Sequence, residues 1–387
     1  MSSSSTPTNI VDSIMNLEED FVSNMVFVFI VFILFLTMIY ILKTRNLKQK
    51  ECSYMNNLYP SINGYIRPIS KSNSDHKYNF YDYYIKTAYN ACSGGSYKND
   101  FVDVCNLKSV ISDGVRCLDF EIYSVDNKPV VSTSTSDNLY VKETYNSVPF
   151  ASVMNVIQNY AFSSSTAPNY SDPLIIHLRF KSNNPLMYEE LSAIFKQYTN
   201  TMLGKLYSFR NQNKNLGDAP LLDLMNKVVL IVDASNATFM ETESLLEYVN
   251  ATSNTSYIRL HRYFDVKNAP DAPELTNFNK TGMTIVLADK GSDPSNPSGP
   301  LCRELGCQMV AMRYQKPDNF LQENNMFFNE SSTAFKLKPE ALRYIKKTIQ
   351  IQKANPNYSY APRTTTYGFV GGNKFSFTDS VVSKGKR

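Results

Sequence analysis

Residues 114–137 read GVRCLDFEIYSVDNKPVVSTSTSD and combine two strand patterns with an unusual choice of polar side chains. The largely apolar run 115–123 predicts a buried strand. Asp119 and Glu121 stand two residues apart in it, so their side chains project to the same face. A second expected strand, 129–132, leads into the hydroxyl run STSTS. Two carboxylates beside an Asn could hold Ca²⁺, which takes oxygen ligands, or could simply be solvated at a strand end.

Strand and helix patterns alternate on both sides of this stretch. The expected strands are 83–87, 115–123, 129–132, 174–180, 227–233, 283–288, 308–313 and 335–337. The expected helices are 101–112, 150–162, 188–199, 241–249 and 339–349. Alternation over about 260 residues predicts an α/β fold with a parallel sheet, and a closed (β/α)8 TIM barrel fits that length.

Residues 25–42, MVFVFIVFILFLTMIYIL, form an uncharged apolar run. A helix needs about 20 apolar residues to cross a bilayer, so this run predicts a transmembrane helix. A cleaved signal peptide would have a basic start and a shorter core, whereas this run follows Glu18, Glu19 and Asp20. A buried core helix is the other alternative, and such helices seldom run this long without polar residues.

The charges on either side of this run predict its orientation. Lys43, Arg45, Lys48 and Lys50 follow it, and no basic residue precedes it. The positive-inside rule therefore places the N-terminus outside and the larger part of the chain in the cytosol. Residues 1–42 carry four acidic and no basic residues, which leaves 39 basic against 31 acidic residues, a net charge of +8, for the remainder.

The six cysteines show no metal-binding spacing, and several lie in apolar runs, which suits a reducing compartment. Asn-x-Ser/Thr matches at Asn236, Asn250, Asn254 and Asn329 would instead favour a lumenal body.

Several blocks resemble eukaryotic-type phosphoinositide-specific phospholipase C. GVRCLDFEIYSVDNKPVV, FASVMNVIQNYAF and DPLIIHLRF resemble its X region. SNPSGPLCRELGCQMVAMRYQKPDNFLQENNMFF and KLKPEALR resemble its Y region. The resemblance covers roughly residues 80 to 345. It implies a distorted TIM barrel in two halves, without room for the family's pleckstrin-homology, EF-hand or C2 modules.

Together these observations predict the domain organisation. Residues 1–24 are a short acidic segment, 25–42 the transmembrane helix and 43–75 a polar stalk. The barrel spans 76–349, with the X half at about 80–233, a short linker at 234–257 and the Y half at about 258–345. Residues 350–387 form an extended basic tail.

The catalytic histidines of the resembled family have no counterpart at the matching positions. The first belongs to a Ser-His-Asn motif, where this chain has Ala88-Tyr89-Asn90, and the second position is Thr133. Neither Tyr nor Thr shuttles protons near neutral pH as imidazole does. The chain's histidines are His76, His177 and His261, and we expect them to have no catalytic role.

The resemblance implies a calcium site of which only part is kept. Asn90 matches one ligand, and Asp119 and Glu121 match a pair with the two acids exchanged. The fourth ligand aligns with Arg179, which we expect to form a salt bridge with Asp119 or Glu121 in place of calcium. The family's headgroup contacts are replaced by Ile231, Asp233, Thr284, Val286 and Gly291.

These losses predict a catalytically inactive, membrane-anchored scaffold or docking module that needs no cofactor, with Ca²⁺ relevant only if the site still functions. One alternative is a phosphodiesterase with altered chemistry built on Tyr89, Asp119, Glu121 and Arg179. Another is lipid binding without cleavage. The Asn- and Tyr-rich composition resembles membrane proteins of large DNA viruses, which suggests a virion component. Expected partners are the bilayer through residues 25–42 and proteins through the barrel surface and residues 350–387, and no nucleic acid.

Overall fold

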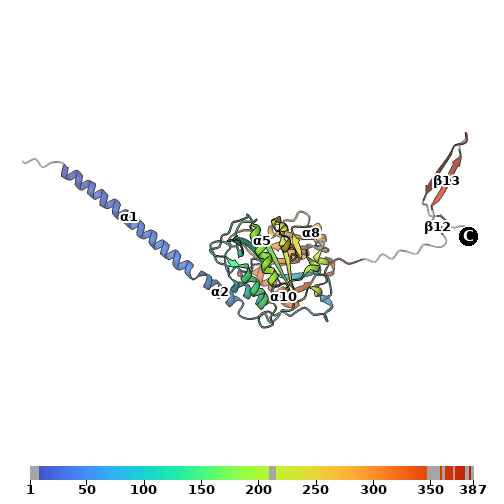
Figure 1. Cartoon of the computed structure of the whole chain (residues 1–387), viewed down its shortest axis with the longest axis horizontal. Helices are drawn as coiled ribbons and strands as arrows, with labels where there is room; N and C mark the ends of the chain where they lie inside the picture. The colour runs from blue at the N-terminus through green and yellow to red at the C-terminus, as the bar shows by residue number, and fades with distance from the viewer. Residues whose placement is uncertain are drawn as a thin grey trace, which may run out of the picture. The chain divides into compact units, whose positions relative to one another are not determined.

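The structure is a computed structural model that describes residues 8–208, 215–346, 358–359, 362–368, 371–379 and 383–384. The chain divides into two compact units, one up to Tyr344 and one from Ile345 on. Figure 1 shows the elements of each along the chain. The first unit holds the N-terminal helices and the α/β body, and the second holds short strands only, among the described residues.

Eight parallel strands form a nearly closed barrel, which confirms the predicted fold. Their hydrogen-bonded order is β7-β6-β5-β2-β1-β10-β9-β8, so the ladder is interrupted between β7 and β8. Three further strands pair antiparallel at the side, β11 (Phe335–Leu337) with β1, and β3 (Lys128–Ser132) and β4 (Val148–Pro149) beyond β2. The barrel strands are β1 (Tyr83–Ala88), β2 (Cys117–Val125), β5 (Leu174–Phe180), β6 (Val228–Asp233), β7 (Ala251–Ser253), β8 (Ile258–Arg262), β9 (Met283–Leu287) and β10 (Met309–Met312).

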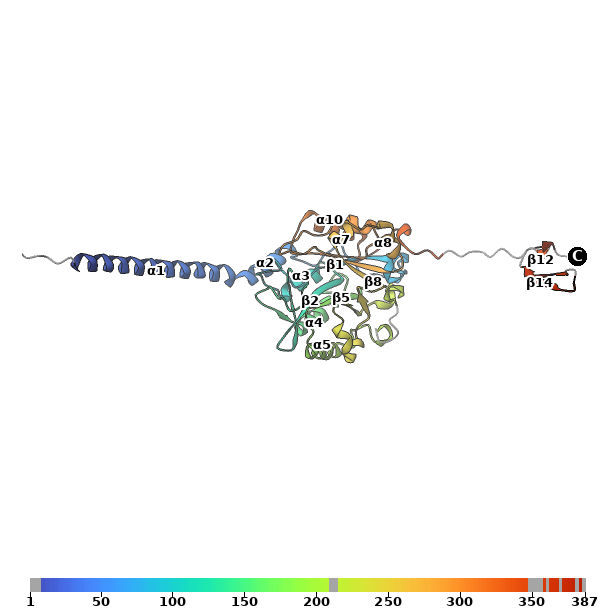
Figure 2. The ribbon, with the colours of Figure 1, turned by 90° about the horizontal axis from the view of Figure 1, so that it is seen from above.

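Helices surround the sheet (Figure 2). Several begin at side chains that accept hydrogen bonds from the first turn, such as Asn184 before α5 and Asp318 before α10. They are α3 (Val104–Ser112), α4 (Phe150–Val156) with a π-helical continuation (Ile157–Ala161), α5 (Pro185–Gln197), α6 (Glu243–Leu246), α7 (Tyr263–Lys267), α8 (Ala272–Phe278), α9 (Gly299–Glu304) and α10 (Asn319–Ser331). The expected helix 241–249 is therefore much shorter, and a 3₁₀ turn (Glu340–Leu342) stands at the start of the expected helix 339–349.

Alternation along the strands separates two hydrophobic cores. Ile175 on β5 and Val229 on β6 pack inside the barrel, whereas their neighbours Ile176 and Leu230 pack outward under the helices. Successive strand residues point to opposite faces, so only every second position reaches the barrel interior. This alternation decides which polar residues can meet at the carboxyl ends of the strands.

The helix α1 (Thr8–Arg45) contains the apolar run. It is long and apolar enough to span a membrane, and the large apolar side chains of its run are exposed. After one intervening residue, Asn46, the chain continues as α2 (Leu47–Leu58).

Part of the expected stalk is a helix packed on the barrel. Met55 of α2 is fully buried in the outer core. Cys52 of α2 forms a disulfide with Cys105 of α3, which differs from the expectation of free cysteines. The remaining four cysteines are free and buried. Sequence composition missed this because Met55 and Cys52 are isolated among polar residues.

The second unit contains two small antiparallel ladders, where the sequence suggested an extended tail. Strand β13 (Arg363–Gly368) pairs with β14 (Lys374–Asp379), and β12 (Tyr358–Ser359) pairs with β15 (Ser383–Lys384). The last part of the expected helix, 347–349, and the end of the basic tail, 385–387, lie outside the described residues.

Candidate functional site

The acidic pair lies at the carboxyl end of the barrel, where parallel α/β barrels carry their sites. In the β2–β5 ladder Asp119 stands opposite His177, and Glu121 stands opposite Arg179. These residues share the inward-facing parity of Cys117 and Ile175, so all four side chains point into the barrel. Asn90 follows β1 with a φ of 45°, a left-handed conformation that Asn tolerates well.

Arg179 occupies the space between the three expected metal ligands. Its Nε and Nη2 donate to the two carboxylate oxygens of Asp119 at 2.9 and 2.7 Å. Its Nη1 donates to Glu121 Oε1 at 2.8 Å, and its Nη2 also donates to Asn90 Oδ1 at 3.0 Å. The salt bridge that the sequence predicted is therefore present, and it is bidentate on Asp119.

Burial makes the charges of this ion cluster depend strongly on one another. Burial alone would raise the pKa of Asp119, but Arg179 and His177 hold it well below its ordinary value. Burial alone would lower the pKa of Arg179, but Asp119 and the other neighbouring acids hold it well above its ordinary value. The attraction between the opposite charges, which outweighs the effect of burial, therefore keeps Asp119 and Arg179 ionised.

The donor set does not fit a calcium ion. Calcium takes six to eight oxygen ligands. The Arg179 guanidinium binds the Asn90 side-chain oxygen, both carboxylate oxygens of Asp119 and one carboxylate oxygen of Glu121. A fixed positive charge at that point repels a dication. Glu121 Oε2 accepts a further hydrogen bond from the Tyr123 hydroxyl at 2.7 Å, so this carboxylate is satisfied without a metal.

His177 lies directly beside the cluster, although the sequence suggested no role for it. Its Nδ1 is 2.8 Å from Asp119 Oδ1, and its Nε2 is 2.9 Å from Ser253 Oγ at the end of β7. This is the order of contacts in a Ser-His-Asp triad. Ser253 and His177 have no solvent-exposed surface, so a substrate cannot reach the hydroxyl. The three residues therefore serve as a buried hydrogen-bond network.

Tyr89 and Thr133, which the sequence resemblance aligned with the catalytic histidines, take part in packing. The Tyr89 hydroxyl accepts a hydrogen bond from Arg262 Nη1 at 3.0 Å, and the Arg179 guanidinium lies 5.0 Å from the ring centre. Thr133 is buried and donates to the Tyr97 carbonyl at 3.2 Å. Neither residue places a titratable group for proton transfer near pH 7 at the barrel mouth.

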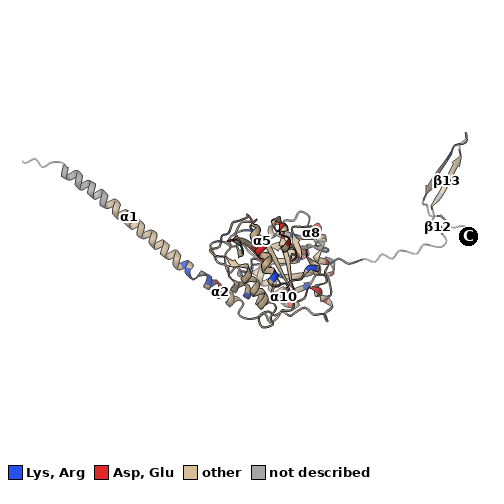
Figure 3. Ribbon diagram, viewed as in Figure 1, with Lys and Arg blue, Asp and Glu red and all other residues tan. Residues whose placement is uncertain are grey.

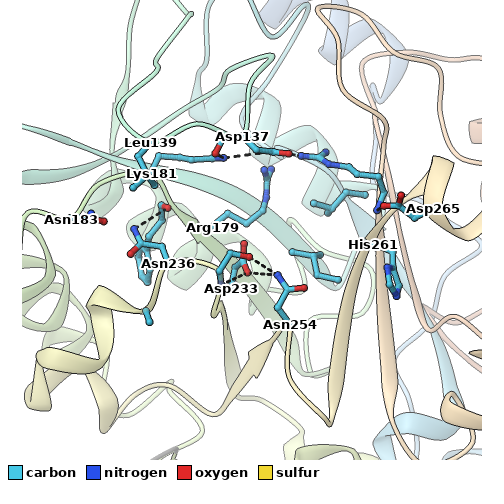
Figure 4. Close-up of a pocket in the computed structure, with 16 residues that line it drawn as sticks. Asp137, Leu139, Arg179, Lys181, Asn183, Asp233, Asn236, Asn254, His261 and Asp265 are labelled. Carbon is cyan, nitrogen blue, oxygen red and sulfur yellow. Dashed lines mark hydrogen bonds and ion pairs between the residues drawn. The ribbon is translucent and has the colours of Figure 1, made fainter.

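A pocket of about 520 Å³ opens above the ion cluster, at the end of the barrel (Figure 4). Basic and acidic side chains both lie around it, in keeping with the mixed charge of the barrel surface (Figure 3). His261 lies at the edge of the pocket, with its ring turned away from Arg179 (Figure 4). The charged residues that line the pocket are Asp137, Arg179, Lys181, Asp233, Arg262 and Asp265.

Asp137 crosses the pocket mouth and joins the two halves of the barrel. Its carboxylate pairs with Arg262 at 2.5 Å and with Lys290 at 2.7 Å, both from the Y half. Lys181 of the X half lies 3.6 Å from the same carboxylate and donates to the Asp137 carbonyl at 3.0 Å. Burial would raise the pKa of Asp137, but the surrounding cations hold it well below its ordinary value.

The positions assigned to lost headgroup contacts fall in different places. Asp233 lines the pocket, where its Oδ1 accepts from Asn254 Nδ2 at 2.7 Å. Ile231 is fully buried in the inner core below the pocket.

Thr284 and Val286 lie on β9 with side chains that do not face the barrel interior. Val286 packs in the outer core, and Thr284 Oγ1 donates to Asn279 Oδ1 at 2.6 Å, so both side chains face the helices. The inward positions of β9 are Ile285 and Leu287, because strand neighbours alternate. Gly291, with a φ of 139°, is not among the pocket's lining residues in the described part of the chain.

Comparisons with known proteins agree with this fold. Residues 77–233 match the family model for the X domain of phosphatidylinositol-specific phospholipase C. No curated protein sequence matches the chain. The crystal structure of L. pealei PLC21 superposes with a TM-score of 0.55 at 18% identity, over 70% of this chain. The crystal structure of S. officinalis PLC21 superposes with a TM-score of 0.54 at 18% identity, over 71% of this chain. The chain spans only 38% and 39% of the length of those two proteins.

A third similar structure, a calcium-dependent phosphoinositol-specific phospholipase C from a Gram-negative Pseudomonas species, has a TM-score of 0.39 at 12% identity, over 62% of this chain and 91% of that one. The resemblance seen in the sequence is thus confirmed for the X region by the family model, and for the barrel as a whole by the shared fold.

Proposed function

We propose that this chain is a catalytically inactive, membrane-anchored phospholipase C-like barrel that serves as a scaffold or docking module. The observation that carries the proposal is the position of Arg179, whose guanidinium satisfies Asp119, Glu121 and Asn90 where the resembled enzymes hold calcium. With an arginine in place of the metal, the site cannot supply the Lewis acid on which calcium-dependent cleavage rests.

The residues at the expected proton-transfer positions also support the proposal. Tyr89 and Thr133 stand at the positions of the two histidines, and both are held by packing and hydrogen bonds. The two imidazoles nearest the site are used otherwise, because His177 is enclosed and His261 faces away from Arg179. Cleavage of a phosphodiester would therefore lack the pair of imidazoles that supply the base and the acid in the resembled family.

The membrane part of the proposal rests on α1. Its apolar run is long enough to cross a bilayer. The four basic residues that follow it favour a cytosolic position for the barrel under the positive-inside rule. The Cys52–Cys105 disulfide favours an oxidising environment instead, because such bonds are rare in the cytosol. A viral membrane protein that docks other virion components is the setting we propose from the composition.

The test is hydrolysis by the full chain. The purified protein, in nanodiscs that contain phosphatidylinositol and its phosphorylated forms, is assayed for release of water-soluble inositol phosphates with and without Ca²⁺. We expect none above background. Calcium-dependent turnover by the wild-type chain would overturn the proposal, and turnover without calcium would favour a phosphodiesterase with altered chemistry.

Lipid binding without cleavage is a second candidate, favoured by the cations at the pocket. Arg179, Lys181 and Arg262 all line it, and an anionic headgroup is the ligand such a lining attracts. Flotation of the chain lacking residues 1–45 with phosphoinositide-containing liposomes tests this candidate. Loss of binding in Arg262→Gln would support it, provided that Arg259→Gln still binds. Arg259 is the control because it pairs with Glu274 of α8 and does not line the pocket.

A further inference from the structure

The junction between α1 and the barrel is a fixed connection. Only Asn46 separates the last residue of α1 from the first residue of α2. Helix α2 is bound to α3 by the Cys52–Cys105 disulfide, and Lys48 Nζ lies 2.6 Å from Asp103 at the start of α3. The first half of α2 is therefore held by one covalent and one ionic contact.

The second half of α2 is held as well. Met55 is fully buried in the outer core. Ser109 Oγ on α3 donates to Asn56 Oδ1 at 3.3 Å, and the Tyr59 hydroxyl donates to the Tyr314 carbonyl at 2.8 Å. Contacts along the whole helix leave α2 little freedom to move as a linker, so the barrel has a defined orientation relative to this helix.

One contact reaches directly from the apolar run to the barrel. The Tyr40 hydroxyl donates to the Tyr145 hydroxyl at 3.0 Å. Tyr40 precedes the last apolar residue, Leu42, by two positions, or about 3 Å along a helix. Tyr145 thus lies at the level where the apolar run ends.

Tyr145 belongs to a small aromatic cluster on the barrel surface. Its ring centre is 5.3 Å from that of Phe101, and its backbone N–H donates to the Asp100 carbonyl at 2.9 Å. Tyr145 is 40% exposed. Tyrosine and other aromatic side chains concentrate at the headgroup level of membrane proteins, because the ring is apolar and the hydroxyl can reach water.

Basic residues follow the apolar run and precede Phe101 and Tyr145 by three positions each in the sequence. Lys43 and Arg45 stand in the last turn of α1. Lys98 pairs with Glu143 at 3.0 Å and is half exposed, and Lys142 Nζ donates to the Thr144 carbonyl at 3.1 Å. Cations at this level are attracted to the phosphates of anionic lipids.

We propose that Phe101 and Tyr145, in line with Tyr40, form a second membrane contact that rests the barrel on the headgroup layer of the bilayer its own helix enters. The Cys52–Cys105 disulfide keeps α2, and with it this contact, in register. The partner is a lipid surface with anionic headgroups. The inference rests on the membrane-spanning role of α1 and is independent of whether the barrel hydrolyses lipid.

The experiment uses the full chain in nanodiscs of phosphatidylcholine and phosphatidylserine. Tyr145→Cys carries an environment-sensitive NBD label, and Met326→Cys on α10 is the matched control because Met326 is 62% exposed. The native free cysteines Cys92, Cys117, Cys302 and Cys307 are buried and do not compete for the label. Lipids with a nitroxide near the headgroup quench only labels that lie at the interface.

We expect blue-shifted emission and at least threefold stronger quenching at position 145 than at position 326. Equal quenching at the two positions would overturn the inference. A second labelled variant adds Cys52→Ser and Cys105→Ser, and we expect quenching at position 145 to fall toward the control, whereas unchanged quenching would overturn the role of the disulfide. Failure of the chain to enter nanodiscs would overturn the anchor itself. The hydrolysis assay reports separately on the inactive site.

Discussion

The Arg179 guanidinium holds both carboxylate oxygens of Asp119 at 2.9 and 2.7 Å, inside a barrel where neither side chain is more than 3% exposed. The pair joins adjacent parallel strands, β2 and β5, and its third partner, Glu121, lies on the same strand as Asp119. Two buried carboxylates therefore depend on one cation, and this dependence has consequences for stability, metal binding and pH response.

Removing the cation is expected to destabilise the barrel strongly. Arg179→Gln leaves two buried carboxylates without a charge partner, and breaking a buried pair from one side costs about 3–5 kcal/mol. Urea unfolding followed by circular dichroism measures the loss. Arg259→Gln is the matched control, because Arg259 forms a more exposed pair with Glu274 and its loss costs at most about 1 kcal/mol. Equal losses in the two variants would contradict this account of the cluster.

Changing the sign of that residue is expected to create calcium affinity. Arg179→Glu would add a third carboxylate to Asn90, Asp119 and Glu121, and such oxygen ligands suit Ca²⁺. In thermal unfolding, millimolar Ca²⁺ should raise the Tm of this variant and leave the wild-type Tm unchanged, since a ligand stabilises only the state that binds it. The double variant Arg179→Glu with Glu121→Gln should lose most of the gain. A calcium-dependent Tm in the wild type would show that the arginine does not replace the metal.

Asp172 is expected to make stability fall as the pH rises. Burial raises the pKa of Asp172 to about 7 from an ordinary 3.8, and the nearby Arg116 only partly offsets this effect. Between pH 4 and 7 the unfolded chain therefore releases a proton that the folded chain keeps, so folding becomes less favourable until the folded pKa is passed.

The variant Asp172→Asn removes this titration. Relative to wild type it should gain stability from pH 4 to pH 7, by up to about 4 kcal/mol, because each pKa unit corresponds to about 1.4 kcal/mol. Urea unfolding at a series of pH values measures the difference, and Asp126→Asn at an exposed turn reports the effect of removing an unburied carboxylate. A constant difference across the series would contradict the raised pKa.

Asp137 is expected to compete with anions for the pocket. It neutralises Arg262, Lys290 and Lys181 together, so Asp137→Asn leaves three cations around one neutral amide. Sulfate or inorganic phosphate should then raise the Tm of the variant by several degrees more than that of wild type, because each of these anions can replace the lost charge. Asp289→Asn serves as a neighbouring control. The same anion response in both variants would show that Asp137 does not block the site.

The sequence predicted the elements whose signal is local. Strand β5 was expected at its observed bounds, because most of its residues are apolar and turn-forming residues flank it. The contact of Arg179 with Asp119 and Glu121 could also be expected, since a charge in a buried strand must find a partner on a neighbouring one.

Contacts between residues far apart in the sequence could not be predicted, because they depend on the path of the loops and on how the elements pack. Asp137 pairs with Arg262, which lies 125 positions further along the chain. Nothing in the sequence STSTSD, which ends at Asp137, indicates where this carboxylate will lie. The facing of Thr284 and Val286 depends on a one-residue register, which sequence blocks with few identities cannot fix. The disulfide joins helices whose cysteines are 53 positions apart, and helix patterns say nothing about which neighbours they pack against.

The Cys52–Cys105 disulfide is expected to contribute to stability and to report the compartment. Closing a loop of 53 residues corresponds to about 4 kcal/mol in the chain-entropy account. A reducing agent should therefore lower the urea midpoint of the purified wild type, and leave the Cys52→Ser, Cys105→Ser double variant unchanged because its remaining cysteines are free and buried.

A second experiment, in cells, counts the cysteines that were bonded. Free thiols are blocked under denaturing conditions, and the protein is then reduced and tagged with a maleimide polymer. Two tagged cysteines, absent from the double variant, would show that the bond forms where the barrel resides, and would favour an oxidising compartment over the cytosolic side that the basic flank indicates. No tagged cysteine would favour the cytosolic orientation and would remove the covalent link between α2 and α3.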